Sequence, residues 1–195
     1  MVFLLDIDGV LNKSDYFTTS YSKDFGVDPQ IFSQFFESEF PYTLTNDKDL
    51  SEMLPTFLKI WKWEKSVDEF LDYWFRNDVK LDRELLLLIR HYRLLGYRVG
   101  IASQQERCRK EYLLYNQGLD NEFDCFYFSC DLGYLKSEAN FYKAISEKES
   151  NPIYLWDDTP AVIEKAAHHD FRAYLYHDNQ KLKQEIEVII QQHEF

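Results

Sequence analysis

Two aspartates, Asp6 and Asp8, stand one residue apart in "VFLLDIDGVLN", directly after an apolar stretch and before Gly9. Side chains two positions apart on a strand point the same way, so we expect the two carboxylates to lie close together near its end. Unpaired carboxylates there repel each other and lose hydration, so a positive group must lie beside them. Mg²⁺ is the natural candidate because it prefers oxygen ligands and is commonly held by carboxylates and a phosphate. By itself the short motif is also typical of a solvated turn.

Three more apolar segments end in, or lead to, residues that could take part in the same chemistry. Ser103 closes "YRVGIAS", Lys136 follows "CFYFS" in "LGYLK", and the pair Asp157 and Asp158 closes "PIYLWDD". Continuous apolar runs of this length are typical of strands buried on both faces of a parallel sheet. Because the carboxyl ends of parallel strands meet at one edge, we expect these polar residues to converge there with the first two aspartates.

The segments between these runs have the pattern of helices, and together they predict an α/β fold with a parallel sheet. The expected strands are 2–7, 97–103, 125–129, 152–158 and 172–177. The expected helices are 81–96, 104–118, 137–148, 159–169 and a last one from 179. Gly96 and Gly118 are expected to end two of these helices, because glycine readily takes the left-handed conformation that follows a helix.

The alternation stops between residues 15 and 81, where "PQIFSQFFESEF" and "SVDEFLDYWFRNDV" have the pattern of amphipathic helices with no strand between them. We predict an inserted helical unit at 15–81 and a core made of 1–14 and 82–195. The unit holds 16 of the 34 aromatic residues, including three of the four tryptophans. We expect these rings to fill a small helical core, and a surface that recognises the substrate is the alternative.

In this order the four motifs resemble those of the haloacid dehalogenase-like (HAD) phosphohydrolase superfamily. "DIDGV" matches the first motif, Ser103 in "IASQQE" the second, Lys136 in "GYLKSEANFY" the third, and the two aspartates of "WDDTP" the fourth. The resemblance spans residues 2 to about 175 and implies a HAD-like Rossmannoid parallel sheet flanked by helices. It also implies that the insert is an α-helical cap of the C1 class, which lies between the first and second motifs.

The resemblance implies distinct roles for the acidic residues. Asp6 would be the nucleophile that becomes an aspartyl-phosphate, and Asp8 would be the general acid and base. A carboxylate is a competent nucleophile, and a displacement in two steps needs a second group that moves protons. Mg²⁺ would be held by Asp6, the backbone carbonyl of Asp8 and Asp158, with Asp157 in its outer coordination sphere. Alternatively, the last two aspartates would only cap or charge the first turn of the helix that follows them.

The resemblance also implies that Ser103 and Lys136 bind the substrate phosphate, with Gln104 beside them. Taken alone, Ser103 would instead be the N-cap of the next helix, and Lys136 an exposed cation in a loop. Two positions depart from the family pattern. Gln104 stands where Thr or Asn is frequent, and Ser137 stands where Pro often follows the lysine. Neither change removes a reacting group, so they leave the substrate and the rate open rather than the mechanism.

The resulting prediction is Mg²⁺-dependent hydrolysis of a small phosphomonoester through an aspartyl-phosphate, by a HAD-family phosphatase. A phosphomutase of the same fold keeps the same residues and stays an alternative. A dehalogenase would need neither Asp8 as acid and base nor the metal-binding aspartate pair. A non-catalytic binding or regulatory protein that retains the fold is the alternative from another class. Loss of an acidic motif residue would favour it, and none is lost.

The charge balance restricts the partners. Acidic residues outnumber basic ones 34 to 22, for a formal net charge of −12, so we expect neither nucleic acid nor an anionic membrane to bind. A small phosphorylated metabolite fits if a cation reverses the sign of the field locally. The three cysteines form no CxxC pair, and no run approaches the ~20 apolar residues of a membrane span, so we expect a cytoplasmic protein.

Overall fold

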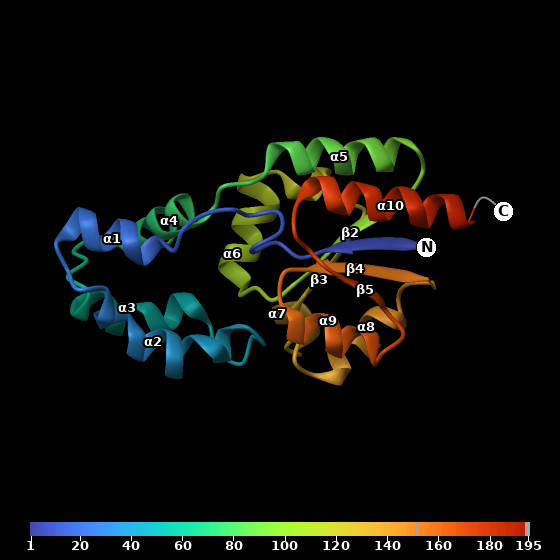
Figure 1. The fold of residues 1–195 in the computed structure, drawn as a ribbon. Coiled ribbons are helices and arrows are strands. Elements are labelled where there is room, and N and C mark those ends of the chain that lie inside the picture. Colours follow the sequence, from blue (N-terminus) through green and yellow to red (C-terminus); the bar gives the residue numbers. More distant parts are fainter. Residues whose placement is uncertain (151, 194–195) are drawn as a thin grey trace.

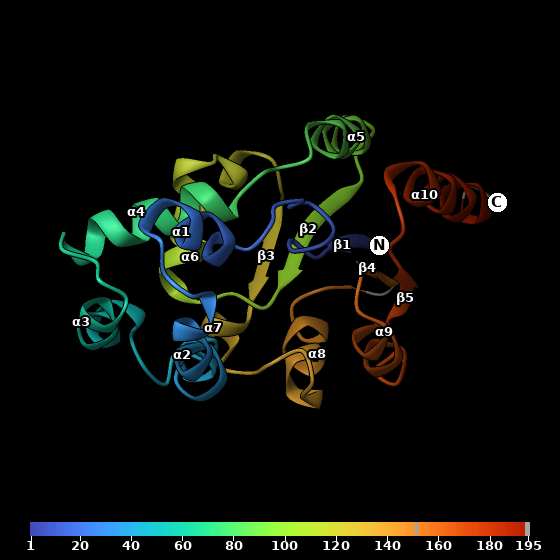
Figure 2. The same cartoon turned by 60° about the vertical axis from the view of Figure 1, so that its left-hand side comes forward.

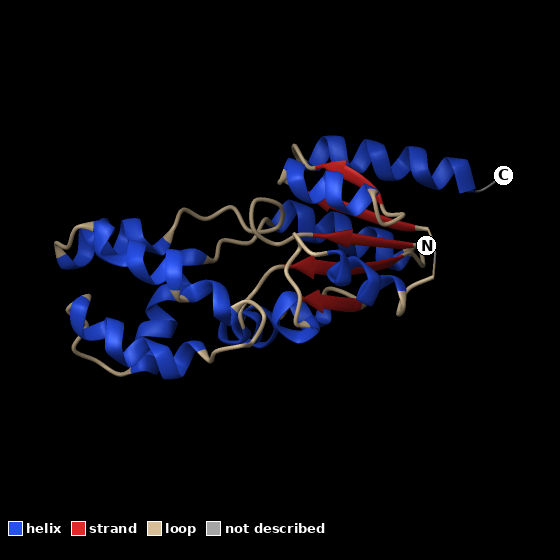
Figure 3. Ribbon diagram, turned by 90° about the horizontal axis from the view of Figure 1, so that it is seen from below, coloured by secondary structure: helices blue, strands red, loops and turns tan. Residues whose placement is uncertain are grey.

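Five parallel strands form one sheet in the computed structural model, which describes residues 1–150 and 152–193. They are β1 (Val2–Leu5), β2 (Arg98–Ser103), β3 (Cys125–Phe128), β4 (Ile153–Asp157) and β5 (Arg172–Leu175). The strand order is β3-β2-β1-β4-β5, so β1 lies in the middle, with Phe3 opposite Val99 on one side and Tyr154 on the other. Because the strands run the same way, their carboxyl ends share one edge, which points toward the helical insert (Figure 3).

Helices cover both faces of the sheet (Figure 1). They do so in two pairs, α5 (Arg83–Leu94) and α10 (Asn179–His193) on one face and α8 (Ala139–Ser146) and α9 (Pro160–Ala167) on the other. Successive side chains of a strand point to opposite faces. Phe3 and Leu5 of β1 therefore join the hydrophobic cluster under the first pair, whereas Val2 and Leu4 join the cluster under the second. The predicted α/β fold with a parallel sheet is confirmed.

The predicted strands are confirmed, each one or two residues shorter than expected in total. The segment 104–118, expected to be one helix, is less regular. It forms α6 (Arg107–Glu111) and then a π-helical turn at Tyr112–Asn116, with a 3-10 turn at Leu119–Asn121 after it. A short helix, α7 (Ser129–Leu132), follows β3. Within the described part of the chain, no helix is long and apolar enough to cross a membrane.

The insert forms a separate helical lobe beyond the carboxyl edge of the sheet (Figures 1 and 2). Its elements are α1 (Phe17–Phe25), a 3-10 turn at Pro29–Phe32, α2 (Ser33–Ser38), a 3-10 turn at Phe40–Thr43, α3 (Leu50–Ile60) and α4 (Val67–Asp78). α4 begins with a capping box. The Ser66 hydroxyl accepts a hydrogen bond from the Glu69 amide, and the Glu69 carboxylate accepts one from the Ser66 amide.

The aromatic residues of the insert mostly fill its own hydrophobic core, as expected. Trp61, Trp63 and Trp74 are buried there, and each ring lies 5.4 to 6.0 Å from that of Phe70. This core is distinct from the two clusters that flank the sheet. Tyr16 does not belong to it, and its side chain is 83% exposed.

Candidate functional site

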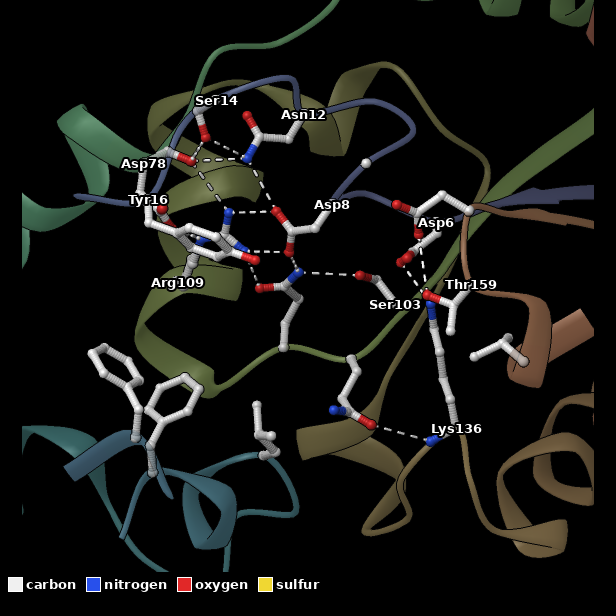
Figure 4. Close-up of a pocket in the computed structure, with 18 of the residues that line it drawn as sticks. Asp6, Asp8, Asn12, Ser14, Tyr16, Asp78, Ser103, Arg109, Lys136 and Thr159 are labelled. Carbon is white, nitrogen blue, oxygen red and sulfur yellow. Dashed lines mark hydrogen bonds and ion pairs between the residues drawn. The ribbon is translucent and has the colours of Figure 1, made fainter. Parts of the chain in front are cut away.

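A cavity of about 1370 Å³ lies between the carboxyl edge of the sheet and the insert (Figure 4). Its lining includes most of the residues predicted to carry the chemistry, namely Asp6, Asp8, Ser103, Gln104, Lys136 and Asp158. Asp157 is fully buried beside them. The structure therefore brings together residues that follow or close different strands, as the parallel topology predicts.

The chain turns sharply directly after β1. The Ile7 carbonyl accepts hydrogen bonds from the amides of Val10 and Asn12, at 3.3 and 2.7 Å. Gly9, within the turn, has a φ of 77°, which residues with a side chain rarely adopt. A Cβ atom at this position would lie 1.8 Å from Oδ2 of Asp158. Gly9 thus makes the turn possible and also lets the fourth motif approach the first.

The turn sends the carboxylates of Asp6 and Asp8 to different partners, so the expectation that they point the same way is wrong (Figure 4). The two-residue alternation holds within a strand, and β1 has ended before either residue. Asp6 faces Lys136, whereas Asp8 faces Arg109. A side-chain cation therefore lies beside each carboxylate.

Lys136 is buried between two carboxylates. Its Nζ lies 2.7 Å from Oδ1 of Asp6 and 2.6 Å from Oδ2 of Asp157. Burial raises the pKa of Asp6 to about 6, because desolvation outweighs the attraction of Lys136, and the charge of Asp157 adds to the rise. Although burial opposes it, the two carboxylates hold the pKa of Lys136 above its ordinary value. The alternative in which Lys136 is an exposed loop cation is wrong.

Three carboxylates are close enough to share a metal ion. One oxygen from each of Asp6, Asp157 and Asp158 lies within 4.8 Å of the other two. Lys136 balances one of these three charges, and Oδ1 of Asp6, although buried, accepts no well-aligned hydrogen bond. An excess of negative charge on a set of oxygen donors fits a hard divalent cation such as Mg²⁺. Asp157 also accepts a hydrogen bond from the Thr159 amide at 2.9 Å, so it supports the start of α9 as well.

Asp8 forms a bidentate ion pair with Arg109. Its Oδ1 and Oδ2 accept hydrogen bonds from Nη2 and Nη1, each at 2.7 Å. Asn12 and Gln105 donate to the same carboxylate at 3.0 and 2.7 Å. Partial burial in the cavity acts to raise the pKa of Asp8, but Arg109 and these hydrogen bonds lower it to about 2. The carboxylate is therefore held in its ionised form.

Asp78, the last residue of α4, joins this network from the insert. Its Oδ2 lies 3.2 Å from Nε of Arg109, and its carbonyl accepts hydrogen bonds from Asn12, at 2.8 Å, and from Ser14. Burial raises the pKa of Asp78 to about 6, with Arg109 acting against the rise. Arg109 thus connects Asp8 in the first motif to the end of the insert.

Sequence reasoning missed Arg109, Gln105, Asn12 and Asp78. A signal is present for two of them, because Gln105 and Arg109 stand four residues apart in the segment 104–118, where the predicted helix would place them on one face. In the structure, Nη1 of Arg109 donates to Oε1 of Gln105 at 2.6 Å. Asn12 and Asp78 carry no comparable local signal.

Ser103 and Gln104 line the cavity beside Lys136. The Ser103 hydroxyl accepts a hydrogen bond from Nε2 of Gln105 at 3.1 Å, and Oε1 of Gln104 accepts one from the backbone amide of Lys136 at 3.3 Å. Ser103 does not cap the following helix, so that alternative is wrong. Glu106 is the N-cap of α6, and its carboxylate accepts hydrogen bonds from the amides of the first helical turn.

No protein-family model matches the sequence, and no curated protein is significantly similar to it. Several solved structures do resemble the chain. A HAD family enzyme from Bacteroides thetaiotaomicron, in complex with magnesium and inorganic phosphate, matches with a TM-score of 0.77 and 18% identity, over 93% of this chain and 98% of that one. A predicted HAD-like family hydrolase from Porphyromonas gingivalis matches with a TM-score of 0.78 and 18% identity, over 97% of both chains. A dehalogenase matches with a TM-score of 0.64 and 15% identity, over 88% of this chain and 82% of that one.

At these identities the similarity establishes the fold. It extends over nearly the whole chain, so it includes both the sheet and the helical insert between β1 and β2. The order of the four sequence motifs predicts the same architecture. The chain therefore has the fold of the HAD-like hydrolase superfamily.

Proposed function

We propose that the protein is a Mg²⁺-dependent phosphatase that hydrolyses a small phosphomonoester through an aspartyl-phosphate. The observation that carries the proposal is the meeting of Asp6, Lys136, Asp157 and Asp158 at one edge of the sheet, beside a large cavity. The magnesium and inorganic phosphate in the Bacteroides structure of the same fold support it.

Asp6 is the proposed nucleophile. Its carboxylate lines the cavity, and a pKa of about 6 leaves it ionised at neutral pH. A carboxylate oxygen would attack phosphorus, and an acyl phosphate would form as the bond to the leaving oxygen breaks. Lys136 would counter the negative charge of the transition state. The Ser103 hydroxyl and nearby amides, with Gln104 beside them, would donate hydrogen bonds to the phosphate oxygens.

The proposed ligands of Mg²⁺ are Asp6, the backbone carbonyl of Asp8, and Asp158, with Asp157 just outside them. When bound, the ion would screen the repulsion between the attacking carboxylate and the phosphate. Gly9 would serve this ligand set because a side chain at its position would collide with Asp158.

Asp8 is the proposed acid and base. A carboxyl group whose pKa is about 2 has no proton to donate at neutral pH and is a weak base. Asp8 would therefore have to leave Arg109 before it transfers protons. Arg109 also contacts Asp78 at the end of the insert, so a movement of the insert would act on this ion pair.

We propose that residues 15–81 act as a cap of the C1 class over a core made of 1–14 and 82–195. The separate hydrophobic core of the insert supports this division. The two connections between the parts also lie side by side. The Lys13 amide donates to the Lys80 carbonyl at 3.0 Å, and in the same stretch the chain forms a bridge between Asn12 and Leu81. Paired linkers of this kind allow a lobe to move as a unit over the site.

The test is phosphate release from a panel of phosphomonoesters by the purified protein with Mg²⁺, with EDTA and Asp6→Asn as controls. We expect release that requires Mg²⁺, a covalent phosphate on Asp6 in acid-quenched samples, and no turnover by the variant. A 2-haloacid is tested beside the phosphomonoesters because a dehalogenase shares the fold. Halide release, or no phosphate release from any ester, would reject the proposal. Transfer of the phosphoryl group to a second sugar hydroxyl would indicate a phosphomutase instead.

The cysteines support a reducing compartment, and we propose the cytoplasm. Cys108, Cys125 and Cys130 all carry free thiols in the structure. Free thiols are usual where the cellular environment keeps cysteine reduced. Labelling of all three thiols in freshly lysed cells would agree with this compartment, and protection of any of them as a disulfide would argue against it.

A further inference from the structure

The cavity has two chemically different ends. Near the sheet it is lined by carboxylates, Lys136 and Ser103, whereas the insert lines it with Tyr16, Phe36 and Phe40. Its volume of about 1370 Å³ exceeds the roughly 300–1,000 Å³ typical of ligand pockets, so it has room for more than a phosphate group. A phosphate ester bound at the sheet would therefore direct its leaving group toward aromatic side chains.

Phe36 and Phe40 are fixed in this wall by ring packing. Their ring centroids are 5.3 Å apart, and the ring of Trp74 lies 5.6 Å from the first and 5.9 Å from the second. Phe35 contacts both rings from the core of the insert, at 5.1 and 5.8 Å. The two rings are nevertheless only partly buried and line the cavity. They offer a ligand a rigid aromatic surface, so binding costs little side-chain entropy.

Tyr16 adds a third ring, and this ring is unusually exposed. It directly precedes α1, where the first linker from the core reaches the insert. The residue is 83% exposed although it lines the cavity, as Arg109 does (Figure 4). A large ring left in water at a binding site gains most when a ligand covers it.

We propose that the natural substrate is a phosphomonoester whose leaving group carries an aromatic ring, and that Tyr16, Phe36 and Phe40 bind this ring. The inference rests on the proposed phosphatase function. The core adds Leu135 and Val162 to the lining of the same cavity, which extends its apolar surface. A polyol would bury hydroxyl groups against these side chains and lose hydrogen bonds to water, so the wall favours a flat apolar group.

The test compares 2-phenylethyl phosphate with ethyl phosphate. Both are esters of primary alcohols, so the bond to be broken is similar and the ring is the main difference. We expect kcat/KM to be about tenfold higher, or more, for the ester that carries the ring. Glucose 6-phosphate is the polyol comparison. Acetyl phosphate, an activated acyl phosphate rather than an ester, has a leaving group too short to reach the aromatic wall and reports attack on phosphorus without a contribution from that wall.

Variants test whether the preference comes from the aromatic wall. Tyr16→Ala and Phe36→Leu should each lower the ratio of kcat/KM between the two alkyl esters, by about threefold or more. Tyr16→Phe should keep the wild-type ratio, because the ring rather than the hydroxyl makes the contact. Tyr115→Ala is the matched control, since Tyr115 is 70% exposed and lies outside the cavity lining. It should leave the ratio unchanged.

The outcomes separate this inference from the proposed function. A protein that hydrolyses acetyl phosphate but prefers ethyl phosphate or glucose 6-phosphate to 2-phenylethyl phosphate would overturn the substrate class alone. The substrate class would also be overturned if the protein prefers 2-phenylethyl phosphate but Tyr16→Ala and Phe36→Leu keep the wild-type ratio of kcat/KM between the two alkyl esters. A protein that releases phosphate from none of the three esters with Mg²⁺ would reject the hydrolysis of phosphomonoesters, and the substrate class with it.

Discussion

Replacing Asp6 by asparagine should stabilise the metal-free protein. Asp6 is buried, and its pKa rises from an ordinary value of 3.8 to about 6. A carboxyl group with a raised pKa holds its proton more tightly in the folded state than in the unfolded state. Below the pKa of 3.8 in the unfolded state, the bound proton makes its full contribution to the stability of the fold. This contribution is lost as the pH rises through about 6, the pKa in the folded state. At neutral pH the metal-free fold therefore contains a buried, ionised carboxylate that an amide would replace with a neutral group.

The size of the effect follows from the two pKa values. The difference between 3.8 and about 6 corresponds to ~3 kcal/mol at a pH above both. The pKa of about 6 already includes the attraction of Lys136, so this figure already counts the ion pair that the substitution removes. Asp157 keeps the ammonium paired at 2.6 Å. We therefore expect a net rise in the free energy of unfolding of about 1–3 kcal/mol.

Urea unfolding in EDTA, followed by tryptophan fluorescence, measures this difference. Asp6→Asn should be the more stable protein at about pH 7.5, and the difference should shrink at about pH 4.5, where Asp6 of the folded wild type is protonated. Asp47→Asn is the control, because Asp47 is exposed and hydrogen-bonds to Thr45. Its stability should follow that of the wild type at both pH values. An Asp6→Asn protein that is less stable at about pH 7.5, or a difference that does not change with pH, would refute the reasoning.

Three further predictions concern the turn after β1, the second ion pair and the metal. Gly9→Ala forces a Cβ against Asp158, so the Mg²⁺ affinity measured by calorimetry should fall about tenfold or more. An unchanged affinity would contradict the role of Gly9 in making room for this aspartate. Arg109→Met leaves Asp78 and the half-exposed Asp8 without their ion-pair partner, so the free energy of unfolding in urea should fall by about 3 kcal/mol. Arg109→Lys should recover part of this free energy. An unchanged free energy of unfolding in Arg109→Met would mean that the ion pairs of Arg109 do not stabilise the fold. Mg²⁺ at about 100 times its Kd should raise the unfolding free energy of the wild type by ~2.7 kcal/mol. An equal rise in Asp6→Asn would exclude Asp6 as a ligand.

The sheet can be predicted from the sequence because strands buried on both faces are continuous apolar runs. Every residue of β1 and of β4 is buried, and both segments stand out in the sequence for that reason. The ends of the elements are predicted less well. The segment 104–118 has one unbroken helical pattern, yet its backbone changes to a π-helical turn at Tyr112–Asn116. Nothing in the residue types marks that change.

The site can be predicted in part, and the limit is set by topology. Ser103 and Asp158 directly follow or close strands, so parallel pairing alone brings them to Asp6. Arg109 reaches Asp8 across 101 positions of the chain, from inside α6 rather than from the end of a strand. Such a pair depends on how the helix packs, which a single sequence does not record.

The aromatic insert shows the same limit at the level of single residues. Phe35 and Phe36 are neighbours of identical type in one helix. Phe35 is fully buried in the insert core, whereas Phe36 is partly exposed and lines the cavity. The sequence predicts that the rings pack together but does not tell which of them reaches the site, because that choice depends on where the lobe lies over the sheet.

Two ion-paired groups divide the proposed chemistry between the core and the insert. Lys136 and Asp6 both lie on the core, whereas Arg109 joins Asp8 to Asp78 at the end of α4. A movement of the insert would thus leave the nucleophile in place and change the surroundings of the group that moves protons. In the proposed two-step reaction one carboxyl group gives a proton in the first step and takes one in the second. An Asp8–Arg109 pair that opens when the insert moves would let Asp8 change its protonation state, while Lys136 stays beside Asp6.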